Sequence, residues 1–118
     1  MQDPLIQAIR EADGEALREL LSEDVIFHSP VQTYRGREQV VRLFVLVGGV
    51  LERWDVTREL DGVTFFAAEV EEHPVDGVLV QRAGEDGRIA EITLMLRPLA
   101  GLQAAVARMT RALAKPPV

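Results

Sequence analysis

The spacing of apolar residues predicts two short helices at the start of the chain. Leu5, Ile6, Ile9 and Ala12 recur at helical intervals, and Pro4 suits a first helical turn. Asp13-Gly14 breaks this pattern, and Asp13 is placed to cap a second helix. That helix is expected to end near Ser22-Glu23-Asp24, and its apolar face comprises Ala16, Leu17, Leu20 and Leu21.

A strand, a loop and a third helix are predicted next. The β-branched and aromatic run Val25-Ile26-Phe27-His28 ends at Ser29-Pro30, which predicts a strand, and a loop is expected from Val31 to Gly36. Helical spacing then returns, and Gly48-Gly49 is expected to fray or end this helix. Its apolar positions are Val40, Val41, Leu43, Phe44, Val47 and Leu51.

In the second half of the chain the period changes from helical to two, which predicts a meander of four strands. Turn sequences at Asp61-Gly62 and at 84–87 separate hairpin partners, and Pro74 is expected to limit a strand. The predicted strands are Trp54–Leu60, Val63–Glu72, Val75–Arg82 and Ile89–Arg97. A last helix is predicted over Leu99–Leu113, with an apolar stripe of Leu99, Leu102, Val106, Met109 and Leu113.

Helices followed by antiparallel strands indicate an α+β fold, with helices against one face of a curved sheet. The 118 residues suit a single domain, expected over 1–114, with Lys115-Pro116-Pro117-Val118 as a loose tail.

The net charge of −6 argues against a nucleic-acid partner, because phosphate binding needs clustered Lys and Arg. No window approaches a membrane span, and no signal-like segment opens the chain, so a cytoplasmic protein is expected.

The chain has no cysteine, which excludes disulfides, thiolate metal sites and cysteine nucleophiles. His28 and His73 stand alone, without the spacing of known metal sites, so we expect neither a metal nor another cofactor.

Four local strings are similar to those of the SnoaL-like and ketosteroid isomerase-like families of the nuclear transport factor 2 superfamily. They are LLSEDVIFHSPV at 20–31, YRGRE at 34–38, DGRIAEI at 86–92 and LRPL at 96–99. The resemblance implies a cone-shaped sheet wrapped around helices, an apolar pocket that opens at one end, and a homodimer packed through the outer face of the sheet. The final helix is longer than in the isomerases.

The same resemblance implies that the isomerase catalytic groups are missing. In the isomerases a carboxylate base precedes the proline of the first strand, and that position is Ser29 here, which cannot abstract a carbon-bound proton unaided. The position of their tyrosine acid falls near Leu5. The position of their protonated aspartate, an acid kept neutral by an apolar site, falls near Leu79.

Three side chains are candidates for chemistry at the pocket. His28 titrates near neutral pH and could act as a base, an acid or a ligand anchor, or it could point away from the pocket and cap a loop. Ser29 and Tyr34 could hold a polar group of a ligand, or serve as a turn residue and a half-buried anchor. The predicted ligand contacts are Phe27, His28, Ser29, Tyr34, Phe44, Trp54, Phe65, Leu79 and Leu94.

The later strands raise a further hypothesis. Glu69, Glu71 and His73 would share a strand face, and as inward-facing acids they could be general acids with raised pKa values. The opposite face, with Thr64, Phe66, Ala68 and Val70, is a better core face, so the acids are expected in solvent. On the closing strand Ile92, Leu94 and Leu96 should face the core and pocket.

Two functions remain open at this point. The first is a pocket protein for a small hydrophobic ring compound, either a binder or an enzyme of the isomerase or cyclase type. The second is a non-catalytic dimeric binding or scaffold module, whose cone is filled by side chains such as Phe44, Phe65 and Trp54.

Overall fold

The computed structural model describes residues 3–114, so the predicted tail at 115–118 lies outside the described residues. Four helices and six strands follow one another in the predicted α+β order, apart from one short additional strand. They are α1 (Pro4–Arg10), α2 (Gly14–Leu20), β1 (Leu21–His28), β2 (Thr33–Arg35), α3 (Arg37–Val50), β3 (Glu52–Leu60), β4 (Val63–Val70), β5 (His73–Ala83), β6 (Ile89–Arg97) and α4 (Leu99–Ala114).

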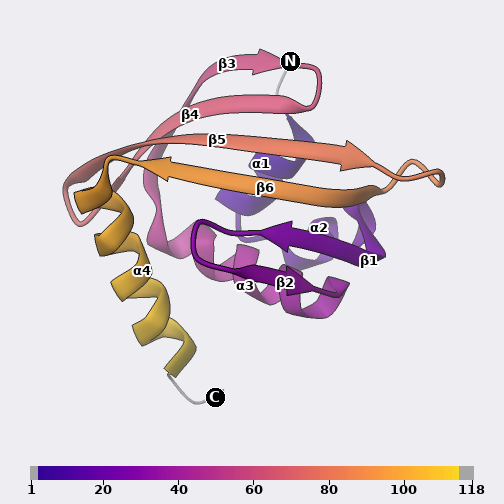
Figure 1. Ribbon diagram of the computed structural model, residues 1–118, viewed down its shortest axis with the longest axis horizontal. Coiled ribbons are helices and arrows are strands. Elements are labelled where there is room, and N and C mark those ends of the chain that lie inside the picture. The colour runs from indigo at the N-terminus through magenta and orange to yellow at the C-terminus, as the bar shows by residue number, and fades with distance from the viewer. Residues whose placement is uncertain (1–2, 115–118) are drawn as a thin grey trace.

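All six strands belong to one curved sheet in the order β2-β1-β6-β5-β4-β3. The β1–β6 pair is parallel and every other pair is antiparallel, so the predicted meander of β3 to β6 is confirmed. Helices α1, α2 and α3 lie on one face of the sheet, and α4 descends from the end of β6 along one side (Figure 1). The other face of β5 and β6 carries no described helix.

The core lies between the helices and the inner face of the sheet. Along β4, alternate residues are buried, so Thr64, Phe66, Ala68 and Val70 form the core face as predicted. Each fully buried side chain of the size of Phe44 contributes about 1.5–3 kcal/mol relative to leaving it exposed. Of the described helices, none is long and apolar enough to span a membrane.

The predicted cap of the second helix and the two predicted hairpin turns are present in the structure. The side chain of Asp13 accepts a hydrogen bond from the Ala16 N–H at 3.1 Å and caps α2. Gly62 and Gly87 occupy the two predicted hairpin turns with φ of 75° and 82°, which is the left-handed region that favours glycine.

Three predictions near the start of the chain were wrong. Helix α1 ends at Arg10, and Ala12 lies in an exposed turn with a φ of 51°. Helix α2 ends at Leu20, because Leu21 enters the sheet opposite Ile89 and β1 therefore begins four residues before the predicted Val25. The expected loop contains β2, because residues 33–35 pair antiparallel with β1.

Gly48-Gly49 does not end the third helix, which continues to Val50. A Cβ at Gly48 would collide with the carbonyl oxygen of Ile9, so this glycine lets α3 pass close to α1. Tertiary packing has therefore outweighed the weak helix propensity of the two glycines.

The predicted shared face of Glu69, Glu71 and His73 was also wrong. Strand β4 ends at Val70, and Glu71 lies in the following turn with a φ of 48°. His73 begins β5 and pairs with Val70. Pro74 lies inside β5 rather than before it. The pairing of β5 with β6 begins only at Asp76, so Pro74 removes no hydrogen bond between these two strands.

Candidate functional site

A cavity of about 270 Å³ lies between α3, α4, the inner face of β6 and the β1–β2 hairpin. Its described walls are mostly apolar and contain no charged side chain. They comprise Phe27, Ser29, Pro30, Val31, Gln32, Tyr34, Leu43, Val47, Val50, Leu51, Leu94, Leu96, Leu102, Ala105, Val106, Met109, Thr110 and Leu113. The arrangement matches the usual composition of small-molecule sites, although the volume is just below their usual range of about 300–1,000 Å³.

One wall is built from aromatic pairs on the β1–β2 hairpin. Tyr34 stands directly opposite Phe27, so both rings point to the same face of the sheet, with centroids 6.2 Å apart and planes at 22°. Phe27 in turn meets Phe44 of α3 edge-on at 4.6 Å. This stacking fixes Tyr34, which is half-buried, against the core, and its hydroxyl is hydrogen-bonded to Gln32 of the same hairpin.

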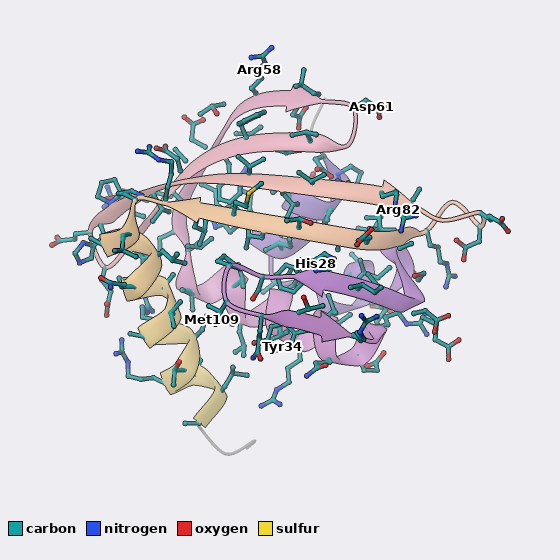
Figure 2. The ribbon with its side chains drawn as sticks, viewed as in Figure 1. His28, Tyr34, Arg58, Asp61, Arg82 and Met109 are labelled. Carbon is teal, nitrogen blue, oxygen red and sulfur yellow. The ribbon has the colours of Figure 1, made fainter. Side chains whose placement is uncertain are left out.

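The opposite wall is the inner side of α4. Gly101 and Ala105 are the described buried residues of this helix, and a Cβ at Gly101 would overlap Val75 of β5. The helix is therefore held close to the sheet at its start, while Met109 and Leu113 of its last turns face the cavity. Met109 on α4 and Tyr34 on β2, which Figure 2 labels, both line the cavity.

Two salt bridges attach α4 to the rest of the chain. Arg108 lies 3.4 Å from Glu52 at the start of β3, and Arg111 lies 3.3 Å from Glu71 in the β4–β5 turn. Exposed ion pairs of this kind contribute little individually, about 0–1 kcal/mol. The position of α4 is consequently determined mainly by apolar packing at its first turns.

Ser29, which the sequence resemblance places at the position of the isomerase carboxylate, lines the cavity but uses its hydroxyl in the hairpin turn. The Ser29 Oγ donates to the Gln32 carbonyl at 2.8 Å and accepts from the Val31 and Gln32 N–H groups at 3.2 and 3.0 Å. Such a serine stabilises the turn. Leu5 and Leu79, near which the resemblance places the other two isomerase positions, are buried in the core and are not among the described cavity walls.

His28, labelled in Figure 2, lies outside the described cavity walls. It follows Phe27 on β1, and neighbours on a strand point to opposite faces. Its Nδ1 is 3.0 Å from the Thr33 hydroxyl and its Nε2 is 2.7 Å from Glu91, which also pairs with Arg82 at 3.1 Å. The hydrogen bond to His28, followed by the one to Arg82, holds the pKa of Glu91 below its ordinary value. The network joins β1, β5 and β6 across the uncovered face of the sheet.

The remaining predicted ligand contacts divide between the cavity, the core and the outer face. Leu94 lines the cavity, whereas Phe44 belongs to the core. Trp54 stacks on Phe66 at 4.8 Å and donates its indole N–H to the Leu51 carbonyl at 2.8 Å. Phe65 alternates with the buried residues of β4, so it points to the outer face of the sheet. Within residues 3–114, no cluster of His, Asp and Glu could hold a metal ion.

Sequence reasoning missed the contribution of α4 to the cavity. Leu102, Val106, Met109 and Leu113 belong to the predicted apolar stripe of the last helix, but the spacing of the stripe does not show which surface it faces. All four line the cavity, whereas Leu99, the fifth member, is 67% exposed. Gln32 was also missed, since a single glutamine in a predicted loop carries no signal of its own.

The fold and a clear sequence match relate the chain to known proteins. Residues 4–92 match the family model for the SnoaL-like domain. A steroid delta-isomerase from Pseudomonas aeruginosa is 35% identical, with a TM-score of 0.85 over 92% of this chain and 85% of that one. Comparison with curated proteins gives no significant match.

Two further solved structures share the architecture. An uncharacterised protein with a cystatin-like fold from Silicibacter pomeroyi is 25% identical, with a TM-score of 0.87 over 95% of this chain and 84% of that one. A nuclear transport factor 2-like protein of unknown function from Burkholderia xenovorans is 17% identical, with a TM-score of 0.66 over 98% and 90%. The family match and these structures confirm the cone-like α+β fold, and the chain belongs to the SnoaL-like domain family.

Proposed function

We propose that the cavity binds a small, uncharged and mainly apolar molecule. The observation that carries this proposal is the chemistry of the walls, since no described residue that lines the cavity is charged, while hydroxyl and amide groups gather at the hairpin end. An ion would lose its hydration in such a site without gaining a partner, which is strongly unfavourable. The modest volume favours a compound of one or two rings over a larger one.

The residues that line the cavity support binding of this molecule without abstraction of a proton from it. A carbon-bound proton needs a positioned base, and no carboxylate or histidine belongs to the described walls. Ser29 cannot replace one, because its hydroxyl is engaged by the hairpin turn.

Isomerisation is the second candidate, and the steroid delta-isomerase at 35% identity favours it. The test is the conversion of a β,γ-unsaturated ketone to its conjugated isomer, followed by ultraviolet absorbance. A rate above that of the buffer which disappears when Tyr34→Phe is introduced would make the protein an isomerase and refute the binding-only form.

We also propose that the protein forms a homodimer through the uncovered face of the sheet. The alternative function, a non-catalytic scaffold module, requires such a dimer. The side chains of Phe65, Val78 and Met95 lie next to one another on this face, and Met95 is 52% exposed. An apolar centre with charged residues around it is typical of protein interfaces. Light scattering tests this proposal, since Met95→Arg should give a monomer while Ala107→Arg on α4 should not.

The proposed binding is tested by blocking the cavity. Met109→Trp places a large ring in the space, whereas Ala107→Trp places the same ring on the exposed side of the same helix. A panel of one- and two-ring hydrophobic compounds is screened by thermal unfolding, where a ligand at a hundred times its Kd adds about 2.7 kcal/mol of stability. Hits should be lost in Met109→Trp and kept in Ala107→Trp. The proposal is refuted if hits survive Met109→Trp, or if no compound of the panel binds the wild type.

A further inference from the structure

Gln32 and Tyr34 form a hydrogen-bonded pair at the hairpin end of the cavity. The Nε2 of Gln32 lies 2.7 Å from the phenol oxygen of Tyr34, and because an amide nitrogen can only donate, the phenol oxygen accepts this bond. The Tyr34 proton must therefore point elsewhere, and no group within residues 3–114 accepts it. The pair thus presents an unused O–H donor on a wall of the cavity.

The other hydroxyls of the described walls are already donating. The Ser29 Oγ donates to the Gln32 carbonyl at 2.8 Å, and the Thr110 Oγ1 donates to the Val106 carbonyl at 2.9 Å. Among the described cavity hydroxyls, Tyr34 alone retains its proton for a ligand.

The geometry of the pair is held from both sides. Stacking on Phe27 orients the Tyr34 ring, and Ser29 fixes the backbone of Gln32 through its side chain and through its N–H, which donates to the Gln32 carbonyl at 2.9 Å. A phenol that accepts one hydrogen bond becomes a stronger donor of the next, because bonds in a chain polarise one another. Ser29 is thus a positioning residue. It holds Gln32, and Gln32 in turn orients the hydroxyl of Tyr34 that donates to the ligand.

We propose that the Gln32–Tyr34 pair donates a hydrogen bond to a carbonyl oxygen, so that the ligand of this cavity is a neutral ketone, quinone, aldehyde or lactone on an apolar skeleton. This inference rests on the proposed function. A carbonyl accepts a hydrogen bond and brings no donor that the apolar walls would leave unpaired. A carboxylate would accept the same bond, but no described wall residue carries a positive charge to compensate for its lost hydration.

The test compares 1-tetralone with tetralin, which share one bicyclic skeleton and differ in the carbonyl group, by measuring the Kd of each. The wild type is expected to bind the ketone about fivefold more tightly than the hydrocarbon, the contribution of one hydrogen bond between neutral groups. Tyr34→Phe keeps the stacked ring and should bring the affinity of the ketone down to that of the hydrocarbon or below it, because the carbonyl then loses water without gaining a partner. The affinity of the hydrocarbon should not change. Gln32→Leu should leave an intermediate preference, because the phenol stays but is no longer polarised.

The possible outcomes separate this inference from the proposed function. If both compounds bind the wild type with equal affinity, or if the preference for the ketone persists in Tyr34→Phe, the role of the pair is overturned while an apolar cavity remains. If neither compound binds, both proposals fail. The Met109→Trp variant should bind neither compound, and 1-tetralol, which carries both a donor and an acceptor, should bind more weakly than the ketone. A preference for the alcohol would also overturn the assignment of a carbonyl group.

Discussion

Replacing Gly101 by alanine tests how closely α4 approaches the sheet, and therefore how the cavity obtains its second wall. The added Cβ would overlap the Cγ1 of Val75 and lie 3.0 Å from the carbonyl oxygen of Pro74. The Val75 side chain is buried and the second contact is with backbone, so neither neighbour can easily move away. Forcing a methyl group into such a contact costs about 1–3 kcal/mol.

The same change also improves helix propensity, by about 1 kcal/mol. Gly49→Ala in α3 isolates this gain, because it is the same substitution in a helix, and no atom beyond the chain neighbours and the backbone of α3 itself lies within 4 Å of the new Cβ. The free energy of unfolding should therefore be about 1–3 kcal/mol lower for Gly101→Ala than for Gly49→Ala, since the propensity gain is common to both.

Equilibrium unfolding in urea, followed by circular dichroism, measures both variants against the wild type. Val75→Ala removes the overlapping methyl group, so Gly101→Ala should cost less in that background than in the wild type. Equal stability of Gly101→Ala and Gly49→Ala would refute the close crossing of α4 over β5. A cavity ligand should also bind Gly101→Ala more weakly, because the helix that forms one wall is displaced.

Other predictions concern single contacts. Gly36→Ala at the N-cap of α3 should lower the free energy of unfolding by about 1–3 kcal/mol in urea, because its φ of 96° is strained for any side chain although the space beside it is empty. Asp3→Ala should cost about 2–3 kcal/mol, since it removes the cap of α1 and leaves the buried Thr64 hydroxyl unpaired. Thr64→Val should make that loss smaller, and an undiminished loss in the double variant would contradict the pairing. His28→Ala should raise the pKa of Glu91 towards its ordinary value, as followed by carbon NMR. Because the folded-state pKa is lowered, this contribution to stability is present above the unfolded-state pKa and is lost as the pH falls through the folded-state pKa. A Glu91 titration unchanged by His28→Ala would contradict the network.

Part of the candidate site could be expected from the sequence. The strand containing Phe27 and its end at Ser29 follow from local patterns, and Leu94 follows from alternation along β6. Tyr34 was expected in a loop, and only its pairing with Phe27 places it on strand β2. The predicted ligand contacts included both Phe27 and His28, although neighbours on a strand point to opposite faces, and of the two only Phe27 is among the described cavity walls. What local patterns leave open is which of several apolar faces meet around an empty space.

The sequence by itself determined the α+β class, the meander of the last four strands, the hairpin turns and the apolar stripe of the final helix. These features depend on residue spacing and on the conformational preferences of glycine, proline and capping side chains, all of which act over a few residues. Tertiary structure alone decided that Leu21 leaves its helix for the sheet, that Gly48 continues a helix and that α4 encloses the cavity. Those choices depend on contacts between segments distant in the chain, namely pairing with Ile89, approach to Ile9 and the close approach of Gly101 to Val75. These contacts outweigh local preferences that differ by about 1 kcal/mol or less.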